Sequence, residues 1–427
     1  MSSPANTFDT HRVASNEFSA LDRWLRQRLF ARIGAMTGGM LTIEDAFGSV
    51  RLGKTSTSDA LNVSLRVHSP EFYRAIAGNG SIGAGESYMA GAWDCDDLVG
   101  LVRLLVRNRD LLDGMEGGLA KLGGLAMKAL HSLRRNTRIG SRKNVSAHYD
   151  LGNDLFLLFL DDNMMYSSAI FTEADDTLET ASRRKLDRIC QKLQLSPSDH
   201  LIEIGTGWGG MAIHAARHYG CRVTTTTISK EQHALARERV AAAGLNDRIN
   251  VLLEDYRDLS GHYDKLVSIE MIEAIGAQYL DTYFSKCACL LKPEGLALIQ
   301  AITIEDHRYQ QALGSVDFIQ RHIFPGSFIP CVSAMTQAAA HSGELRLLNL
   351  EDIGPSYART LNHWRQRFFA HLEQVRALGY DERFVRMWEF YLCYCEGGFL
   401  ERSISDVHLL FARSGNRRAQ YLPDMAT

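Results

Sequence analysis

The sequence predicts an α/β protein with a doubly wound sheet and a smaller α+β domain on its N-terminal side. After Val145, short apolar runs alternate with helical patterns, which is typical of a sheet covered by helices on both faces. One of these runs leads directly into a cluster of glycines, as in the ligand-binding turns of such sheets. The earlier part of the chain mixes strand and helix patterns, and 427 residues are enough for two domains.

The N-terminal domain is expected to cover residues 1–120. A helical period runs through residues 17–33, and extended segments follow on both sides of Gly48 and at residues 62–68. Residues 98–108 form a helix that is apolar nearly all round. Its Val and Leu side chains either fill a core or line a lipid pocket.

Residues 121–144 are expected to form a basic linker. No acidic residue occurs between Leu119 and Asn144, whereas seven residues in this segment are basic. A basic and partly apolar segment can bind anionic lipid headgroups, and it can equally be a solvated connection between domains. The basic residues are Lys121, Lys128, Arg134, Arg135, Arg138, Arg142 and Lys143.

The second domain, residues 145–427, carries the alternating pattern. We expect strands at residues 201–205, 222–228, 249–254, 264–271 and 295–303, with helices at 209–219, 230–243 and 278–291. Gly244 and Asn246 should end the second of these helices, and residues 292–295 should turn before the fifth strand. A ligand is expected at the carboxyl ends of the strands.

The glycine cluster favours one cofactor class over another. Gly205, Gly207 and Gly209 follow Glu203, which matches the Glu-x-Gly-x-Gly-x-Gly pattern of S-adenosylmethionine methyltransferases better than a dinucleotide loop. The next strand ends without the acidic residue that dinucleotide enzymes use to hold the ribose. An ordinary glycine-rich turn explains the loop alone equally well. Polar groups that could meet the cofactor after the second and third strands are Thr227, Ser229, Gln232, Tyr256 and Arg257.

Two carboxylates, Glu270 and Glu273, close the fourth strand inside an apolar run. Carboxylates at the carboxyl end of a strand are typical of functional sites. Because they are three residues apart, they need not both face the ligand, and one is expected to be structural.

Composition excludes several classes of function. The net charge of −3 argues against a general nucleic-acid binder, and the eight cysteines form no C-x-x-C pair, so neither a metal site nor a disulfide framework is expected. The first residues lack the apolar core of a signal peptide. No apolar run approaches the roughly 18 residues that a membrane-spanning helix needs. We therefore expect a cytoplasmic protein whose membrane contact is peripheral, at the inner face of the membrane.

Several separated motifs follow one another along the chain. They include SIGAGESYMAGAWDCDDL, VSAHYDLGNDLF, MMYSSAIF, LIEIGTGWGG, TTTTISKEQ, EDYRD, SIEMIEAIG, FIQRHIFPG, SYARTLNHWRQRF and MWEFYLCYCEGGF. With these motifs the chain resembles the cyclopropane-fatty-acyl-phospholipid synthase family from about Asn79 to Arg413. The resemblance implies a Rossmann-like methyltransferase sheet and S-adenosylmethionine as cofactor. It also implies transfer of a methyl group to the cis double bond of an unsaturated phospholipid acyl chain, followed by closure of a cyclopropane ring.

The resemblance also implies roles for single residues. A bound bicarbonate ion would act as the base, held by Glu273, the backbone at Ile302, and Tyr357. Ser168 and Gln300 stand where the family has Cys and His; both can hydrogen-bond an anion, but Gln300 cannot carry a positive charge. Cys395 matches a cysteine considered catalytic in the family, with a buried structural thiol as the alternative. The implied cofactor contacts are Tyr166, Ser167, Gly205, Gly207, Gly209, Thr227, Gln232, Tyr256 and Arg257.

Two other functions stay open on the sequence. The same enzyme without ring closure would give a methyl- or methylene-branched acyl chain, and Ser168 and Gln300 keep this outcome open. A lipid-binding protein without catalysis is the third hypothesis, and the intact glycine turn argues against it. The resemblance further suggests a homodimer and favours a membrane contact for the basic linker.

Overall fold

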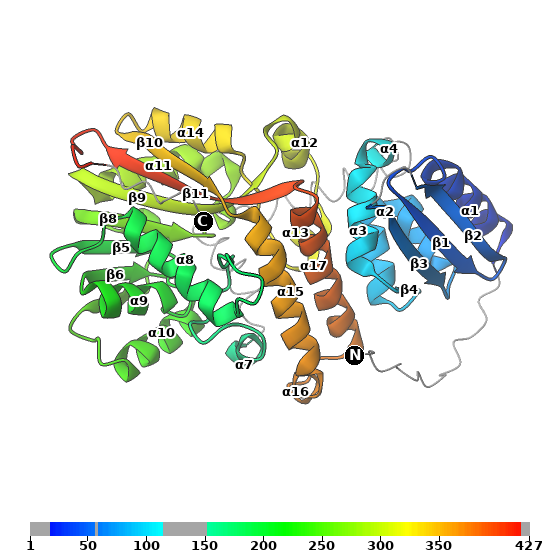
Figure 1. Cartoon of the computed structure of the whole chain (residues 1–427), viewed down its shortest axis with the longest axis horizontal. Helices are drawn as coiled ribbons and strands as arrows, with labels where there is room; N and C mark the ends of the chain where they lie inside the picture. Colours follow the sequence, from blue (N-terminus) through cyan, green and yellow to red (C-terminus); the bar gives the residue numbers. More distant parts are fainter. Residues whose placement is uncertain (1–17, 56–58, 114–151, 420–427) are drawn as a thin grey trace.

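The computed structural model describes residues 18–55, 59–113 and 152–419, which form two sheets and their helices (Figure 1). The smaller sheet has the strand order β2-β1-β3-β4. The predicted basic linker, residues 121–144, lies outside the described residues. The elements of this N-terminal part are α1 (Ala20–Ile33), β1 (Gly39–Asp45), β2 (Gly48–Lys54), β3 (Leu61–Val67), α2 (Glu71–Met89), β4 (Trp93–Cys95), α3 (Leu98–Arg107) and α4 (Arg109–Asp113).

The larger sheet has seven strands in the order β10-β11-β9-β8-β5-β6-β7. The strands from β9 to β7 pair in parallel, and β11 and β10 add antiparallel pairs at one side. The strands are β5 (His200–Ile204), β6 (Arg222–Thr226), β7 (Ile249–Leu252), β8 (Tyr263–Ile269), β9 (Leu291–Ile304), β10 (Leu345–Asp352) and β11 (Ile404–Arg413).

Helices cover both faces of this sheet, so the predicted doubly wound fold is confirmed (Figure 1). Alternation along the strands sorts the side chains: Leu201 faces the core shared with α8 and α9, whereas Ile202 faces the core shared with α11 and α14. The helices of this part are α7 (Asn153–Leu157), α8 (Leu178–Lys192), α9 (Gly210–Tyr219), α10 (Lys230–Ala242), α11 (Leu280–Leu290), α12 (Tyr309–Leu313), α13 (Phe318–His322), α14 (Val332–His341), α15 (Gly354–Ala370), α16 (Leu372–Ala377) and α17 (Glu382–Leu400).

The fifth predicted strand begins earlier than expected. Residues 292–295, predicted as a turn, lie within β9. The pairing with β8 jumps from Tyr263–Leu291 to Lys265–Leu296, so these residues form an irregular start of the strand, which is exposed at residues 292–294. The turn-forming sequence therefore produces a break in register rather than a separate turn.

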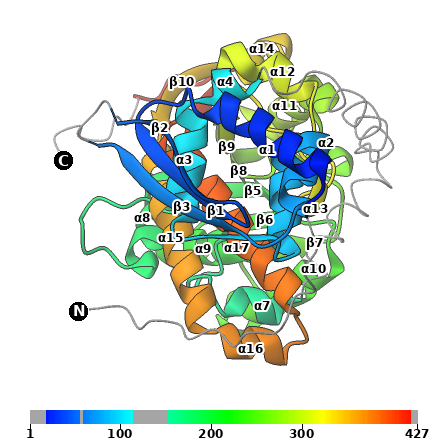
Figure 2. The same ribbon diagram turned by 90° about the vertical axis from the view of Figure 1, so that its right-hand side faces the viewer.

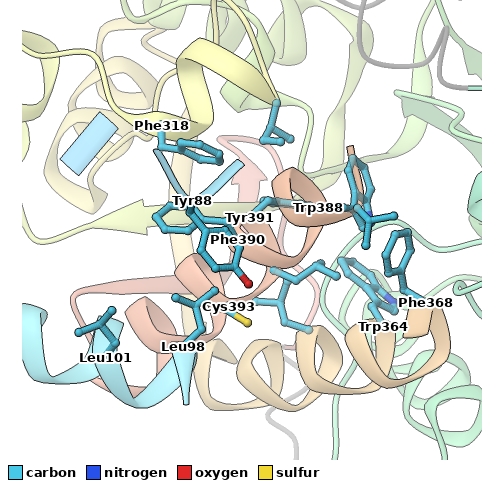
Figure 3. Packing of buried hydrophobic residues seen from close by; sticks show 14 of the residues in the cluster. Tyr88, Leu98, Leu101, Phe318, Trp364, Phe368, Trp388, Phe390, Tyr391 and Cys393 are labelled. Carbon is cyan, nitrogen blue, oxygen red and sulfur yellow. The ribbon is translucent and has the colours of Figure 1, made fainter. Parts of the chain in front are cut away.

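Helix α17 connects the two sheets through an aromatic core (Figures 2 and 3). Its Phe390 and Trp388 are buried, and the hydroxyl group of Tyr88 on α2 donates to Glu389 at 2.6 Å. Leu101 on α3 is buried in the same core, which favours the core interpretation of residues 98–108. No helix in the described part of the chain combines the length and apolarity needed to span a membrane.

Candidate active site

A cavity lies at the carboxyl ends of β5, β6, β7 and β8. This is the edge where ligands bind in open parallel sheets. The segment that precedes α8 forms another part of its wall. The lining residues are Met164, Met165, Tyr166, Ser167, Glu203, Ile204, Gly205, Thr206, Gly207, Trp208, Gly210, Thr226, Thr227, Ile228, Gln232, Glu254, Asp255, Tyr256, Arg257, Ile269, Glu270, Met271, Ala274 and Ile275.

The glycine turn has the backbone that its spacing predicted. Gly205, Gly207 and Gly209 have φ values of 100°, 51° and 86°, in the left-handed region that favours glycine. Gly205 and Gly207 line the cavity, whereas Gly209 precedes α9 as its N-cap. A Cβ atom at Gly210 would collide with the carbonyl of Asn163, so this helix start needs a residue without a side chain.

The predicted cofactor-binding side chains after β6 and β7 form hydrogen bonds or ion pairs with one another or with neighbouring residues. Thr227 and Gln232 line the cavity, and the Thr227 hydroxyl donates to the Gln232 side chain at 2.8 Å. Ser229 caps α10 by accepting from the Gln232 backbone at 3.2 Å, and it is not among the described residues that line the cavity. Arg257 lines the cavity beside Tyr256 and forms a 2.6 Å ion pair with Asp255.

Two buried ionisable side chains support the cofactor side of the cavity. Glu203 accepts from the Thr225 hydroxyl at 2.6 Å, and burial raises its pKa to about 8. Lys185, fully buried on α8, donates to the Ser167 hydroxyl at 2.9 Å, and burial lowers its pKa to about 8. Sequence reasoning missed Lys185, because one lysine in a helix with many cations gives no signal.

Glu270 lies on the cavity wall and collects hydrogen bonds from three segments. Its Oε1 atom accepts from the Ser168 backbone N–H and from Gln300 Nε2, both at 2.8 Å. Its Oε2 atom accepts from the Tyr357 hydroxyl at 2.6 Å. The structure thus brings together three of the predicted catalytic positions, and it brings them to Glu270.

Glu273 lies beside this cluster but not among the described residues that line the cavity. Its Oε1 atom accepts from the Ile302 backbone N–H at 2.7 Å. Its Oε2 atom is buried without a hydrogen-bond partner among the described residues. Burial, and then the negative charge of Glu270, raise its pKa to about 8, so Glu273 is mostly protonated at neutral pH.

Strand β11 adds two buried residues that sequence reasoning missed. Asp406 accepts from Gln300 Nε2 at 2.8 Å, and His408 Nε2 lies 3.2 Å from Gln300 Oε1. Burial and the charge of Glu270 raise the pKa of Asp406 well above its ordinary value, and burial lowers the pKa of His408 well below its own. The contacts of Asp406 and His408 with Gln300 follow from the antiparallel register of β11 and β9, which pairs His408 with Gln300.

Tyr166 links the cavity to the aromatic core. Its ring lies 5.2 Å from that of Trp364, and a 2.9 Å hydrogen bond joins its hydroxyl to that of Tyr391. Cys395, on the same helix as Tyr391, packs against the aromatic core and is not among the described cavity-lining residues. Burial raises the pKa of its thiol, which keeps it in the unreactive neutral form.

The residues expected to hold bicarbonate do not fit a separate ion in this arrangement. Each expected donor already donates to a group of the protein. Gln300 uses its amide group on Glu270 and Asp406, and the Ser168 hydroxyl donates to the Ala169 carbonyl. The remaining donors are engaged by the two glutamates: the Ser168 N–H and Tyr357 hydroxyl by Glu270, and the Ile302 N–H by Glu273.

The fold, the glycine turn and the cavity beside it define an S-adenosylmethionine-dependent methyltransferase. The chain belongs to the mycolic acid cyclopropane synthetase family, whose model matches residues 136–409. It is 40% identical to the tuberculostearic acid methyltransferase UfaA1 of Mycobacterium tuberculosis, over 81% of this chain and 82% of the relative. It is 37% identical to the cyclopropane-fatty-acyl-phospholipid synthase of Escherichia coli strain K12, over 82% of this chain and 87% of the relative.

Solved structures agree with this assignment. The cyclopropane synthase MmaA2 from Mycobacterium tuberculosis superposes with a TM-score of 0.59 at 30% identity, covering 64% of this chain and 98% of that one. The mycolic acid cyclopropane synthase CmaA1, complexed with SAH and CTAB, superposes with a TM-score of 0.58 at 30% identity and the same coverage.

Proposed function

We propose that this methyltransferase transfers the methyl group of S-adenosylmethionine to the cis double bond of an unsaturated phospholipid acyl chain and closes a cyclopropane ring. The observation that carries the proposal is the cavity itself, whose lining joins the glycine turn with Tyr166 and Glu270. The names of two relatives, a cyclopropane-fatty-acyl-phospholipid synthase and a tuberculostearic acid methyltransferase, support a lipid substrate.

The lining residues suit a cofactor with a positively charged sulfur. S-adenosylmethionine, when bound, supplies an electrophilic methyl group. Glu270 offers negative charge on the cavity wall, and Tyr166 offers an aromatic face, both of which attract a cation. The turn at Gly205 and Gly207 lets the backbone approach a ligand closely, and Gln232 on α10 and Tyr256 and Arg257 after β7 offer polar groups at the cavity.

The acceptor demands a different environment. An alkene is a weak nucleophile, so the protein has to align it with the methyl group and exclude water. Attack leaves a carbocation on the chain, which the aromatic ring of the cavity-lining Tyr166 can stabilise. A base near the cavity must then remove a proton before the product is neutral.

Apolar side chains beside the site suit an acyl chain as substrate. Ile302, Tyr394 and Cys395 are partly exposed and pack against the aromatic core. An apolar chain is the natural occupant of such surroundings.

A second product is favoured by specific replacements in this chain. Gln300 cannot take the charged form that the His of the family can take, and the Ser168 hydroxyl is directed to the Ala169 carbonyl. With the same cofactor and substrate, loss of a different proton would give a methyl- or methylene-branched chain. The 40% identical relative is named a methyltransferase rather than a cyclopropane synthase, which supports this candidate.

The wider setting follows from the same proposal. We place the enzyme in the cytoplasm, at the inner face of the membrane that holds its substrate, with residues 1–120 and the basic linker contacting the lipid surface. A homodimer stays a prediction from the family resemblance. A bicarbonate base also stays a prediction, against which the engaged donors around Glu270 argue.

Lipid analysis tests the proposal and separates its two products. The acyl chains of a host that expresses the protein should show the high-field proton signals of a cyclopropane ring by NMR, which an inactive control host lacks. A methylated alkene without these signals would establish the second product. Unmodified acyl chains, in a host that contains the folded protein and unsaturated phospholipid, would contradict both.

A further inference from the structure

We propose that the carboxylate of Glu270 is the base of the reaction and takes the place of a separate bicarbonate ion. This inference rests on the proposed function, because it concerns the proton that a methylated alkene must lose. A Glu270 oxygen forms a bond to the proton as a C–H bond of the transferred methyl group breaks. The electron pair of that bond forms the carbon–carbon bond that closes the ring and neutralises the cation, and Glu270 later returns the proton to solvent.

Glu270 accepts hydrogen bonds from three of the positions expected to face the ion. The family resemblance assigns the anion to Glu273, to the backbone at Ile302 and to Tyr357, with Ser168 and Gln300 at the two positions that differ from the family. In this protein the Ser168 N–H, Gln300 Nε2 and the Tyr357 hydroxyl all donate to the two oxygens of Glu270, at 2.8, 2.8 and 2.6 Å. A carboxylate and a bicarbonate present the same planar pair of oxygen acceptors, so the side chain satisfies the same donors.

The backbone at Glu270 is strained in the way expected of a functional position. Its φ of 45° lies in the left-handed region, which non-glycine residues rarely adopt because of the steric cost of their Cβ. The residue follows directly after β8, and its N–H still donates to the Gln300 carbonyl at 2.9 Å. The strained residue is one of the residues that line the cavity, whereas Glu273 is not among the described lining residues.

The surrounding charges favour Glu270 as the ionised member of the group. Asp406 has its pKa raised far above the ordinary value by burial and by the charge of Glu270, so it holds a proton. Glu273 is mostly protonated at neutral pH, and His408 is neutral. Three donated hydrogen bonds and the cation of Lys185 oppose the effect of burial on Glu270, whose raised pKa makes it a stronger base than a solvated carboxylate.

The test measures methyl transfer to phospholipid vesicles in buffer freed of carbon dioxide, with and without added bicarbonate. The wild-type rate should be the same in both. Glu270→Gln, which keeps the shape but not the basicity, should lose roughly 10²–10⁴-fold in turnover. Glu270→Gly, which opens the space that the carboxylate fills, should lose as much and regain activity with bicarbonate or formate. Glu238→Gln, which removes an exposed carboxylate from α10, should behave like the wild type.

Each contrary outcome has a distinct meaning. A wild-type rate that falls without bicarbonate and returns with it would overturn the inference while leaving the proposed function intact. An undiminished rate in Glu270→Gln would overturn it too. Binding of S-adenosylhomocysteine and the melting temperature show whether the variants fold, and if they do not, the bicarbonate dependence of the wild type decides alone. Absence of methyl transfer in the wild type under every condition would reject the proposed function itself.

Discussion

At the scale of single residues, Glu270 fastens three segments that are distant in sequence. It binds the loop at Ser168, strand β9 at Gln300 and helix α15 at Tyr357. Because charge-assisted hydrogen bonds are stronger than neutral ones, the carboxylate both holds these three segments together and depends on their donors to stay ionised. The charge and the packing of this part of the site are therefore inseparable.

Two glycines of the turn should differ in their tolerance of a side chain. In Gly205→Ala the residue would keep a φ of 100°, and its Cβ would lie 3.1 Å from Met271, so we expect a loss of about 1–3 kcal/mol in unfolding free energy. In Gly207→Ala the φ of 51° should cost about 1–2 kcal/mol, but no atom lies within 4 Å of the new Cβ. That variant should lose less stability than Gly205→Ala but bind S-adenosylmethionine more weakly, since its methyl group enters the cavity.

Urea unfolding and calorimetric titration separate these two effects. The prediction fails if Gly207→Ala binds the cofactor as tightly as the wild type, because the turn would then not face the ligand. Equal stability of the two variants would show that the backbone of the turn adapts more readily than its φ angles indicate.

The site residues that could be predicted from the sequence are marked by a pattern in their immediate sequence neighbours. Gly205, Gly207 and Thr227 could be predicted because strand ends and glycine spacing mark them along the chain. Lys185 and Asp406 could not, since only burial and tertiary contacts distinguish them from ordinary charged residues. The different positions of Glu270 and Glu273 in the site could not be predicted from the sequence either, because they depend on the left-handed backbone at Glu270.

At the scale of elements, an ion cluster fixes α8 to β10. Glu351 pairs with Arg188 at 2.5 Å and with Lys192 at 2.6 Å, and Lys192 is 1% exposed. Burial acts against ionised Glu351, but the two cations outweigh it and lower its pKa to about 2. Removing the carboxylate would leave a buried cation without its counter-charge.

Glu351→Gln should therefore lose about 2–3 kcal/mol in unfolding free energy at pH 7, less than for a fully buried pair because 24% of the Glu351 side chain is exposed. A carboxylate whose folded pKa is depressed stabilises the protein above its unfolded pKa and ceases to do so as the pH falls through the folded value. The difference from the wild type should thus shrink as the pH falls from about 4.5 toward 2.

Urea unfolding at several pH values measures this difference, with Glu238→Gln as the exposed control. A pH-independent difference would show that Glu351 stabilises through packing rather than through charge.

The central strands were predictable because apolar alternation and turn residues mark them, and β5 to β8 lie within a few residues of the expected ranges. The antiparallel strands β10 and β11 and the long helices α15 and α17 were not placed. Strand β11 is almost wholly buried, so it shows no alternation of polar and apolar residues. The apolar side chains of α17 pack into the core on more than one face of the helix, so they do not recur with a clear helical period in the sequence.

At the scale of the whole molecule, α3 docks the N-terminal sheet onto α17 (Figure 2). Arg103 and Arg107 pair with Glu401 at 2.7 and 2.9 Å, and Gly397 lies against Val102. The predicted domain limits at residues 120 and 145 stay predictions, but the described contacts show that the N-terminal sheet is packed against the catalytic part rather than tethered at a distance.

Glycine substitutions test how tightly this contact is packed. Gly397→Ala would place a Cβ 2.6 Å from the Val102 side chain, so we expect a loss of about 1–3 kcal/mol in unfolding free energy. Gly78→Ala, on the exposed side of α2 with no atom within 4 Å, should instead gain about 0.5–1 kcal/mol. Thermal unfolding followed by circular dichroism compares the two. A stabilised Gly397→Ala variant would mean that α3 and α17 separate readily.

The basic linker should anchor the enzyme to anionic lipid. Replacing four of its cations by Gln should weaken binding to anionic vesicles by up to about 4 kcal/mol, at roughly 1 kcal/mol for each charge. Sedimentation with vesicles at rising salt measures the effect, and equal binding by the two variants would assign the contact to another surface. The linker variant changes Lys121, Lys128, Arg134 and Arg135, and the control changes the exposed cations Arg222, Lys230, Arg237 and Arg346.

In the proposed reaction the carbon of an activated methyl group ends in an unsaturated lipid tail. The most direct measurement incubates the purified full chain with S-adenosylmethionine carrying carbon-13 in its methyl group and with vesicles of an unsaturated phospholipid, then records NMR spectra of the released fatty acids. We predict that the label appears in the acyl chain, with ring protons at high field. Acyl chains free of label, although the protein binds the cofactor, would contradict the account.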